Sequence, residues 1–124
     1  MIELERYPSA LAAYDKALEL KPDREAAWYN KGNALFDLKR YPSALAAYDK
    51  ALELKPDRVS AWFNKGFALY YLKRYPEALA AYDKALEFQP NDDNLWYNKA
   101  CCYDRTTISG DRILGENGER DRHF

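Results

Sequence analysis

The residue types that most often carry out chemistry are present in this chain, but they lack the partners that chemistry needs. The single histidine, His123, lies in the C-terminal tail, and no histidine elsewhere can activate a serine as a nucleophile. Cys101 and Cys102 are adjacent and have no second Cys or His pair at the spacing of a metal site. The carboxylates recur at regular intervals along the chain and do not gather in one segment. The sequence therefore predicts no catalytic residue, no metal site and no cofactor.

Net charge and hydropathy argue against two further classes of partner. The formal net charge of −1 gives no overall attraction to nucleic acid or to an anionic membrane. No apolar run approaches the roughly 18 residues of a spanning helix, and Met1–Glu5 lacks the basic and apolar parts of a secretion signal. Neighbouring cysteines on one helix point about 100° apart and bridge badly. We expect no nucleic-acid partner, no membrane partner and a cytoplasmic protein with reduced thiols.

The remaining candidate functional residues are asparagines and aromatic residues, which could bind a polypeptide. Asn30, Asn64 and Asn98 recur at intervals of 34 residues, and an Asn side chain offers both a donor and an acceptor to a peptide backbone. The chain also has 11 tyrosines and 5 phenylalanines, which give large contact areas at a low rotamer cost. These residues can recognise a polypeptide if the fold brings them to one surface.

Helices are the elements that the repeat encodes. A block of 19 residues, Arg6–Arg24, occurs again without change as Arg40–Arg58, and a diverged third copy starts at Arg74. A fixed period of 34 residues is typical of stacked helical repeats. Within a copy the apolar residues form one helical stripe, at i, i+1, i+4, i+7 and i+8: Ala44, Leu45, Tyr48, Ala51 and Leu52.

Proline marks where the helices begin and end. Tyr41-Pro42 opens a helix, since Pro is tolerated in a first turn. Lys55-Pro56-Asp57 closes one helix and begins the next, because Pro cannot extend a helix interior and Asp is a good N-cap. We expect helices over six ranges: 8–21, 26–38, 42–55, 60–72, 76–89 and 93–105.

The anchor residues of this period resemble the tetratricopeptide repeat. They are a Trp series, a Gly series that Ala100 continues, and paired Tyr and Pro residues at the turns: Trp28, Trp62, Trp96, Gly32, Gly66, Tyr41, Tyr75, Pro56 and Pro90. The resemblance implies an all-α fold, a right-handed α-solenoid of about three antiparallel helix pairs. The repeat domain would be 1–105, with a partial unit 1–24, full units 25–58 and 59–92, and a half unit 93–105.

The segment 106–124 departs from the repeat. It contains Gly110, Gly115 and Gly118 but few large apolar residues, so we expect a disordered or loosely attached tail. Three origins are possible for this segment: residues left by cloning, a shifted reading frame, or a true extension of the protein. A short cap folded back on the last helix is the alternative to a loose tail.

In the tetratricopeptide family the first helix of each pair lines a concave groove that commonly holds an extended peptide. The resemblance carries this role to nine residues: Tyr29, Asn30, Asn33, Phe63, Asn64, Phe67, Tyr70, Tyr97 and Asn98. Two alternatives stay open for them. Asn also belongs to the general family pattern, and the aromatic rings could pack between adjacent first helices. A basic row could likewise either extend into solvent or contact an acidic partner: Lys31, Lys65 and Lys99.

One subtype of the family binds the C-terminal carboxylate of chaperone tails through Lys, Arg and Asn. Asn33 and Asn64 match its two Asn positions, whereas its basic positions read Tyr29, Asn94 and Asn98 here. Without a cation the carboxylate loses its main attraction. We therefore do not expect this clamp-type binding.

The resemblance implies a protein–protein interaction scaffold that binds an extended peptide or a partner helix in the concave groove. It is not expected to be an enzyme. Two alternatives remain. The incomplete units at the two ends could stack head-to-tail into a homo-oligomer, or the chain could be a fragment of a larger regulatory protein.

Overall fold

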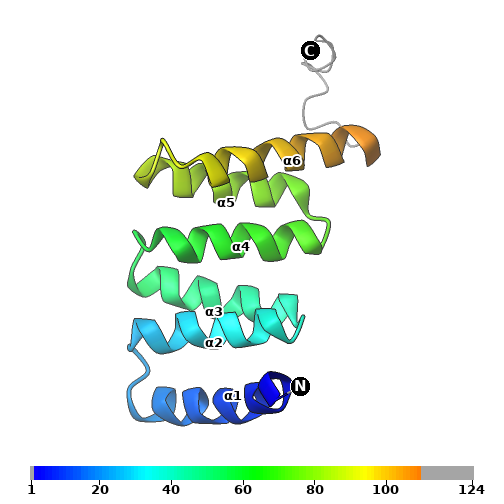
Figure 1. Cartoon of the computed structure of the whole chain (residues 1–124). Helices are drawn as coiled ribbons and strands as arrows, with labels where there is room; N and C mark the ends of the chain where they lie inside the picture. The colour runs from blue at the N-terminus through cyan, green and yellow to red at the C-terminus, as the bar shows by residue number, and fades with distance from the viewer. Residues whose placement is uncertain (1, 110–124) are drawn as a thin grey trace.

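Six helices and no strand make up residues 2–109, the part of the chain that the computed structural model describes. In order they are α1 (Ile2–Leu20), α2 (Glu25–Asp37), α3 (Tyr41–Leu54), α4 (Val59–Tyr71), α5 (Tyr75–Phe88) and α6 (Asp93–Ser109). Each helix packs on the next, from α1 at one end to α6 at the other (Figure 1). The fold is therefore an all-α, right-handed solenoid, as the family resemblance implies, and its six described helices equal the number in three antiparallel pairs.

The inner helices lie where the prolines and the apolar stripe place them. Each of α2 to α5 begins and ends one residue before its expected range. The outer helices are longer than expected. Residues 2–7 continue the helix on the N-terminal side of Pro8, so α1 contains this proline in its interior. At the other end α6 continues to Ser109, so residues 106–109 are helical although the tail was expected to begin at 106. The remainder of the expected tail, 110–124, lies outside the described residues.

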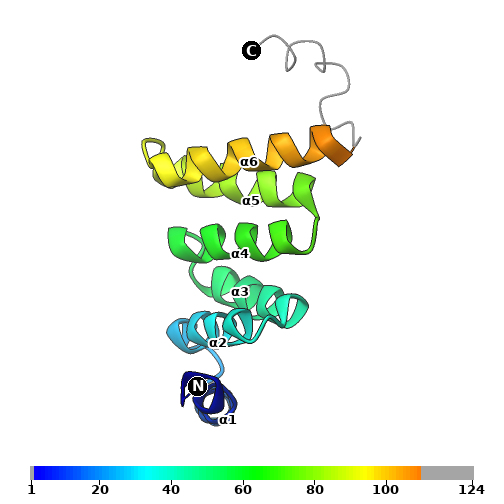
Figure 2. The same cartoon turned by 45° about the vertical axis from the view of Figure 1, so that its right-hand side comes forward.

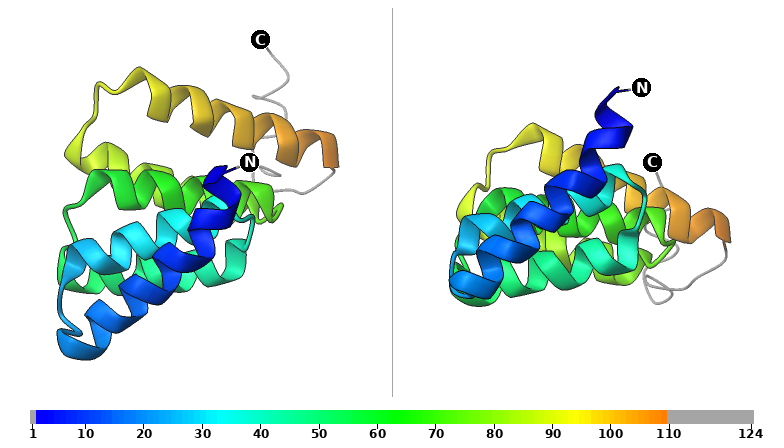
Figure 3. Two further views of the ribbon diagram at one scale, coloured as in Figure 1. Left: turned by 60° about the horizontal axis from the view of Figure 1, so that its bottom comes forward. Right: turned by 90° about the horizontal axis from the view of Figure 1, so that it is seen from below.

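The helix starts and ends alternate between the two edges of the stack. The loops that precede α2, α4 and α6 lie at one edge, so all three of these first helices run in the same direction (Figures 1 and 2). Seen along the stack, α1 crosses the helices above it obliquely (Figure 3). Equivalent residues of the three first helices therefore lie one above another along the stack.

Small residues on the second helices, α3 and α5, let the first helices approach closely. Four alanines of the predicted stripe are 0% exposed: Ala44, Ala51, Ala78 and Ala85. Tyr48 and Tyr82 fill the remaining space and are also fully buried. Gly32 and Gly66 make room for these rings, because a Cβ atom at either glycine would lie 2.6 Å from the Cε1 atom of the tyrosine. The glycines are thus needed for close packing within each helix pair.

Each tryptophan joins a first helix to the loop before it. The indole N–H groups of Trp28, Trp62 and Trp96 donate to the carbonyl oxygens of Pro22, Pro56 and Pro90, each at 2.8 Å. Trp28 and Trp62 are half-buried, whereas Trp96 on the last helix is 51% exposed. The Trp and Pro anchors of the repeat therefore form one hydrogen bond per unit.

The turn inside each pair holds a lysine in a left-handed conformation. Lys39 and Lys73 both have φ of 62°. After α2, the N–H of Arg40 bonds to the carbonyl of Leu35 and the N–H of Lys39 to that of Phe36, at 2.9 and 2.8 Å. This pair of bonds is a Schellman motif, in which glycine is the usual left-handed residue. The turn is therefore strained by its lysine side chain.

Replacing Lys39 or Lys73 by Gly is expected to stabilise the protein. Each change removes the steric cost of a left-handed residue, which is about 1 kcal/mol, and urea unfolding followed by circular dichroism measures the gain. Lys55→Gly is the matched control, because Lys55 ends α3 with φ of −142° and does not need glycine there. A gain of equal size at Lys55 would contradict the explanation.

Candidate functional site

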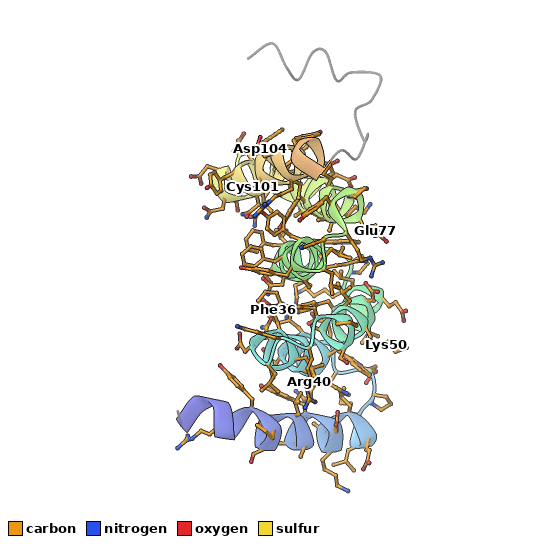
Figure 4. The ribbon with its side chains drawn as sticks, turned by 90° about the vertical axis from the view of Figure 1, so that its right-hand side faces the viewer. Phe36, Arg40, Lys50, Glu77, Cys101 and Asp104 are labelled. Atoms are coloured by element: carbon orange, nitrogen blue, oxygen red, sulfur yellow. The ribbon has the colours of Figure 1, made fainter. Side chains whose placement is uncertain are left out.

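The first helices and the second helices present opposite faces of the stack. Figure 4 shows Phe36 and Cys101 of α2 and α6 on one side, and Lys50 and Glu77 of α3 and α5 on the other. We call the exposed side of α2, α4 and α6 the first-helix face, and the side formed by α3 and α5 the outer face. The nine groove residues singled out in the sequence all belong to the first helices.

The three asparagines of the ladder have three different environments. Asn64 donates from Nδ2 to Asn33 Oδ1 at 3.0 Å and to the Tyr29 hydroxyl at 3.2 Å. Asn98 donates to the Asn94 carbonyl of its own helix at 2.7 Å, and Asn30 is exposed. Asn64 therefore helps to join α4 to α2, while Asn30 is the ladder residue most open to a ligand.

Most of the aromatic residues pack against one another along α4. The Phe67 ring stacks on Phe36 of α2 at 5.8 Å and on Phe63 at 5.5 Å, measured between centroids. Tyr70 meets Tyr75 edge-on at 5.4 Å. Of these contacts, the stack of Phe67 on Phe36 joins two first helices, whereas Tyr70 contacts the second helix α5. Tyr97 on α6 differs, since 69% of it is exposed.

The fully buried tyrosines Tyr48 and Tyr82 differ in the partners of their hydroxyl groups. Tyr48 donates to Asn33 Oδ1 at 2.6 Å. In the next unit Phe67 stands where Asn33 stands in the first, and the Tyr82 hydroxyl is buried with no hydrogen-bond partner among the described residues. Burial raises the pKa of both tyrosines and raises the pKa of the neighbouring Cys102 thiol to about 12. All three groups are thus neutral at physiological pH.

Removing the two hydroxyl groups is expected to have unequal effects on stability. Tyr48→Phe should cost about 1 kcal/mol because it removes a hydrogen bond and leaves Asn33 with one donor fewer. Tyr82→Phe should be neutral or slightly stabilising, since that hydroxyl gains no bond on burial. Urea unfolding of the two variants measures the difference, and an equal loss at both sites would contradict it.

The basic row is neutralised inside the chain. Lys31, Lys65 and Lys99 pair with Asp15, Asp49 and Asp83 at 2.6, 2.7 and 2.8 Å. Each ammonium also lies 5.0–5.4 Å from the centre of the tryptophan ring in its unit. The ammonium groups therefore join each first helix to the second helix before it, which neither sequence interpretation anticipated. The recurring Asp in each copy was the signal that could have revealed it.

The outer face of the described residues also carries a hollow. A groove of about 610 Å³ runs between α3 and α5, over Trp62 and Leu69 of α4. Its charged residues are largely paired within the chain: Lys65 with Asp49 and Arg74 with Glu77. The hydrogen bonds from Arg74 lower the pKa of the Glu77 carboxyl. Sequence reasoning did not predict this groove.

Two kinds of feature are absent from residues 2–109, the part of the chain that the structure describes. No group of three or more His, Cys, Asp or Glu side chains there could hold a metal ion. None of the helices in this range combines the length and the hydropathy that crossing a membrane requires.

Comparisons with known proteins agree on one family. A tetratricopeptide repeat model matches residues 2–59 and 32–93, and a second model with that description matches 81–119. No curated protein sequence matches the chain significantly. Among solved structures, MamA is similar with a TM-score of 0.78 and 20% identity, over 85% of this chain and 60% of that one.

Two further similar structures contain a bound partner. The first TPR of Spaghetti (RPAP3), bound to the HSP90 peptide SRMEEVD, has a TM-score of 0.79 and 23% identity, over 83% of this chain and 82% of that one. The TPR2B domain of yeast Sti1, in a complex with pHsp70, has a TM-score of 0.70 and 26% identity, over 85% and 86%. This chain spans only three-fifths of the MamA structure.

Proposed function

This chain belongs to the tetratricopeptide repeat family, and from that premise we propose that it is a protein–protein interaction scaffold that holds an extended peptide on its first-helix face. The peptide complexes of similar structures support this role. The scaffold has no catalytic step of its own. Neither Cys101 nor Cys102 is part of a disulfide, which supports a reducing location such as the cytoplasm.

The exposure of Tyr97 carries the proposal. It is a large aromatic residue at a groove position of α6, and it presents 69% of its surface to solvent. Asn98 beside it and the exposed Asn30 can bond to a peptide backbone. Tyrosine is enriched among the residues that dominate the binding energy of interfaces.

A random peptide library displayed on phage tests the proposal. The intact chain is expected to select peptides with apolar or aromatic anchors, and Tyr97→Ala should weaken the best of them about tenfold. Phe88→Ala is the matched control, because Phe88 is 44% exposed but belongs to α5. Equal losses at Tyr97 and Phe88, or a failure to select any peptide, would reject the proposal.

The chaperone peptide of the similar structure should bind poorly. Asn33, which matches one clamp position, already accepts hydrogen bonds from Tyr48 and Asn64, and the clamp's basic positions hold no cation here. The peptide SRMEEVD ends in a cluster of negative charge that would find no cationic partner there. Fluorescence anisotropy with the labelled peptide should show no saturable binding, whereas tight binding would show that another cation substitutes.

Self-association is a second candidate function, and the identical segments favour it. The sequence around Tyr14 is the same as that around Tyr48, yet Tyr14 is half-exposed while Tyr48 is buried under α2. On the last helix, Trp96 and Ala100 are exposed where their counterparts are covered by a second helix. The α1 helix of one copy could cover α6 of another as α3 covers α2.

The fit between two copies would be imperfect at one place. Ala100 stands at the position of Gly32, so its methyl group would meet the incoming Tyr14 ring. Ala100→Gly should therefore strengthen association, as measured by analytical ultracentrifugation of the intact chain. A monomer at all concentrations, with or without this change, would remove the second candidate.

A further inference from the structure

A small hollow opens on the first-helix face between the starts of α4 and α6. Its volume is about 270 Å³, and its lining residues come from the starts of α4 and α6 and from the loop before α6. These two helices begin at the same edge of the stack (Figure 1). Val59, Phe63 and Leu95 give it apolar walls, and Gln89, Asp92 and Asn94 give it polar groups. It is smaller than the roughly 300–1,000 Å³ of small-molecule pockets, so it suits a single side chain.

The equivalent place between α2 and α4 is filled by an arginine of this chain. Arg58 donates from Nη2 to Glu25 Oε1 at 2.8 Å and from Nε to the other carboxylate oxygen. Its guanidinium carbon lies 4.3 Å from the centre of the Tyr29 ring. Both members of the ion pair are mostly buried. The solenoid thus shows how a guanidinium group fits between two first helices, over an aromatic ring and beside a carboxylate.

The aromatic ring that carries the guanidinium is retained in the next unit. Phe63 occupies the position of Tyr29, and its ring lies 6.0 Å from Tyr82 at an interplanar angle of 49°. Tyr29 lies 6.0 Å from Tyr48 at 48°. The two rings therefore sit in the same way on their helix pairs, and the space above Phe63 corresponds to the space that Arg58 fills above Tyr29.

The residues that fill this space are not retained. Counting 34 residues along, Val59 replaces Glu25 and Asp92 replaces Arg58. The Asp92 side chain turns to its own helix, where Oδ1 accepts the N–H groups of Asn94 and Leu95 at 2.9 and 3.3 Å. The hollow is the space that the missing arginine leaves, with a carboxylate now at its rim.

We propose that this hollow binds an arginine side chain of the peptide held on the first-helix face, with its guanidinium over the Phe63 ring and paired with Asp92. The inference rests on the proposed function for the identity of the ligand. Both Asp92 hydrogen bonds end on Oδ1, which leaves Oδ2 for the guanidinium. The side-chain carbonyls of Gln89 and Asn94 offer further acceptors for its five N–H donors. Lysine fits less well, because its ammonium is not planar and cannot stack on the ring.

Small probes test the hollow without any knowledge of the natural partner. N-acetyl-arginine amide is titrated into the full chain labelled with ¹⁵N, and saturable shifts are expected for the amides of Phe63, Asp92 and Asn94. N-acetyl-citrulline amide has nearly the same shape without the charge and should produce much smaller shifts. Equal shifts with both probes, or none with the arginine probe, would overturn the inference.

Three variants locate the binding. Asp92→Asn keeps an oxygen to cap α6 and should weaken the arginine probe about tenfold through loss of the charge. Asp93→Asn is the control, because the neighbouring Asp93 does not line the hollow, and its affinity should be unchanged. The double variant Val59→Glu with Asp92→Arg rebuilds the pair of Glu25 and Arg58 and should abolish binding. The Asp92→Arg change removes the side chain that caps α6. The fold tolerates arginine at such a position, because Arg58 is the N-cap residue of α4 and makes no side-chain cap hydrogen bond there.

The outcomes separate this inference from the proposed function. If the chain binds displayed peptides but the arginine probe causes no shifts at the hollow, the inference is rejected and the proposed function stands. Arginine binding to a chain that selects no peptide would reject the peptide-scaffold function and leave the hollow as a guanidinium site. Unchanged affinity in both the Asp92→Asn variant and the double variant would reject the site.

Discussion

Replacing Tyr48 by Ala is expected to lower the free energy of unfolding by about 3–5 kcal/mol, the cost of removing a buried aromatic ring. The ring is 1% exposed and lies over Gly32, with Ala44 and Ala51 on either side along α3. Its loss opens a cavity that the stiff helix pair cannot close, and the Asn33 side chain loses a hydrogen-bond donor. Chemical denaturation followed by circular dichroism measures the change.

Tyr14→Ala is a control with an identical sequence environment. The 19 residues from Arg6 to Arg24 are the same as those from Arg40 to Arg58, so local helix propensity is equal at both sites. Tyr14 is only half-buried, and its replacement should cost about 1 kcal/mol. Equal losses of unfolding free energy at the two tyrosines would mean that the contact of Tyr48 with α2 adds nothing to stability. That result would contradict the packing described above.

Replacing Gly66 by Ala should destabilise the protein although alanine favours helices. The added Cβ would lie 2.6 Å from Cε1 and 2.9 Å from Cδ1 of Tyr82, a ring that is 0% exposed. Overpacking of this kind costs about 1–3 kcal/mol, which opposes a propensity gain of about 1 kcal/mol. We expect a net loss of up to about 2 kcal/mol in denaturant unfolding.

The third unit supplies the reverse experiment. Ala100 stands at the equivalent position of α6, where it is exposed and no described helix covers it. Ala100→Gly should therefore cost about 1 kcal/mol through helix propensity alone. A stabilising effect of Gly66→Ala would show that the Tyr82 ring moves aside freely, and the account of the glycine series would be wrong.

The fold follows from the sequence because the decisive signals are local and recur. The prolines near the helix ends and the stripe through Ala44, Tyr48 and Ala51 are repeated one unit later, which places α2 to α5 within one residue. The extension of α1 through Pro8 was not predicted, because Pro is favoured in the first turn of a helix and the Tyr-Pro pair was therefore interpreted as a helix start.

The site was less predictable, because its contacts join residues that are not one period apart. Asn64 reaches Asn33, and each lysine of the basic row reaches an aspartate of the helix before it. The hollow beside Asp92 arises from two substitutions that are conspicuous only beside the contact of Arg58 with Glu25. The 34-residue period shows which positions are equivalent, but only the packing shows whether equivalent residues have equivalent partners.

The location of a bound peptide tests the central claim most directly. The tightest peptide from the displayed library is titrated into the ¹⁵N-labelled full chain, and the shifted amides are assigned to helices. We expect the shifts in α2, α4 and α6, including Asn30, Phe63 and Tyr97, which belong to the first-helix face. Shifts confined to α3 and α5, around the outer groove beside Asp49 and Glu77, would contradict the proposal that this protein captures its partner on the first-helix face.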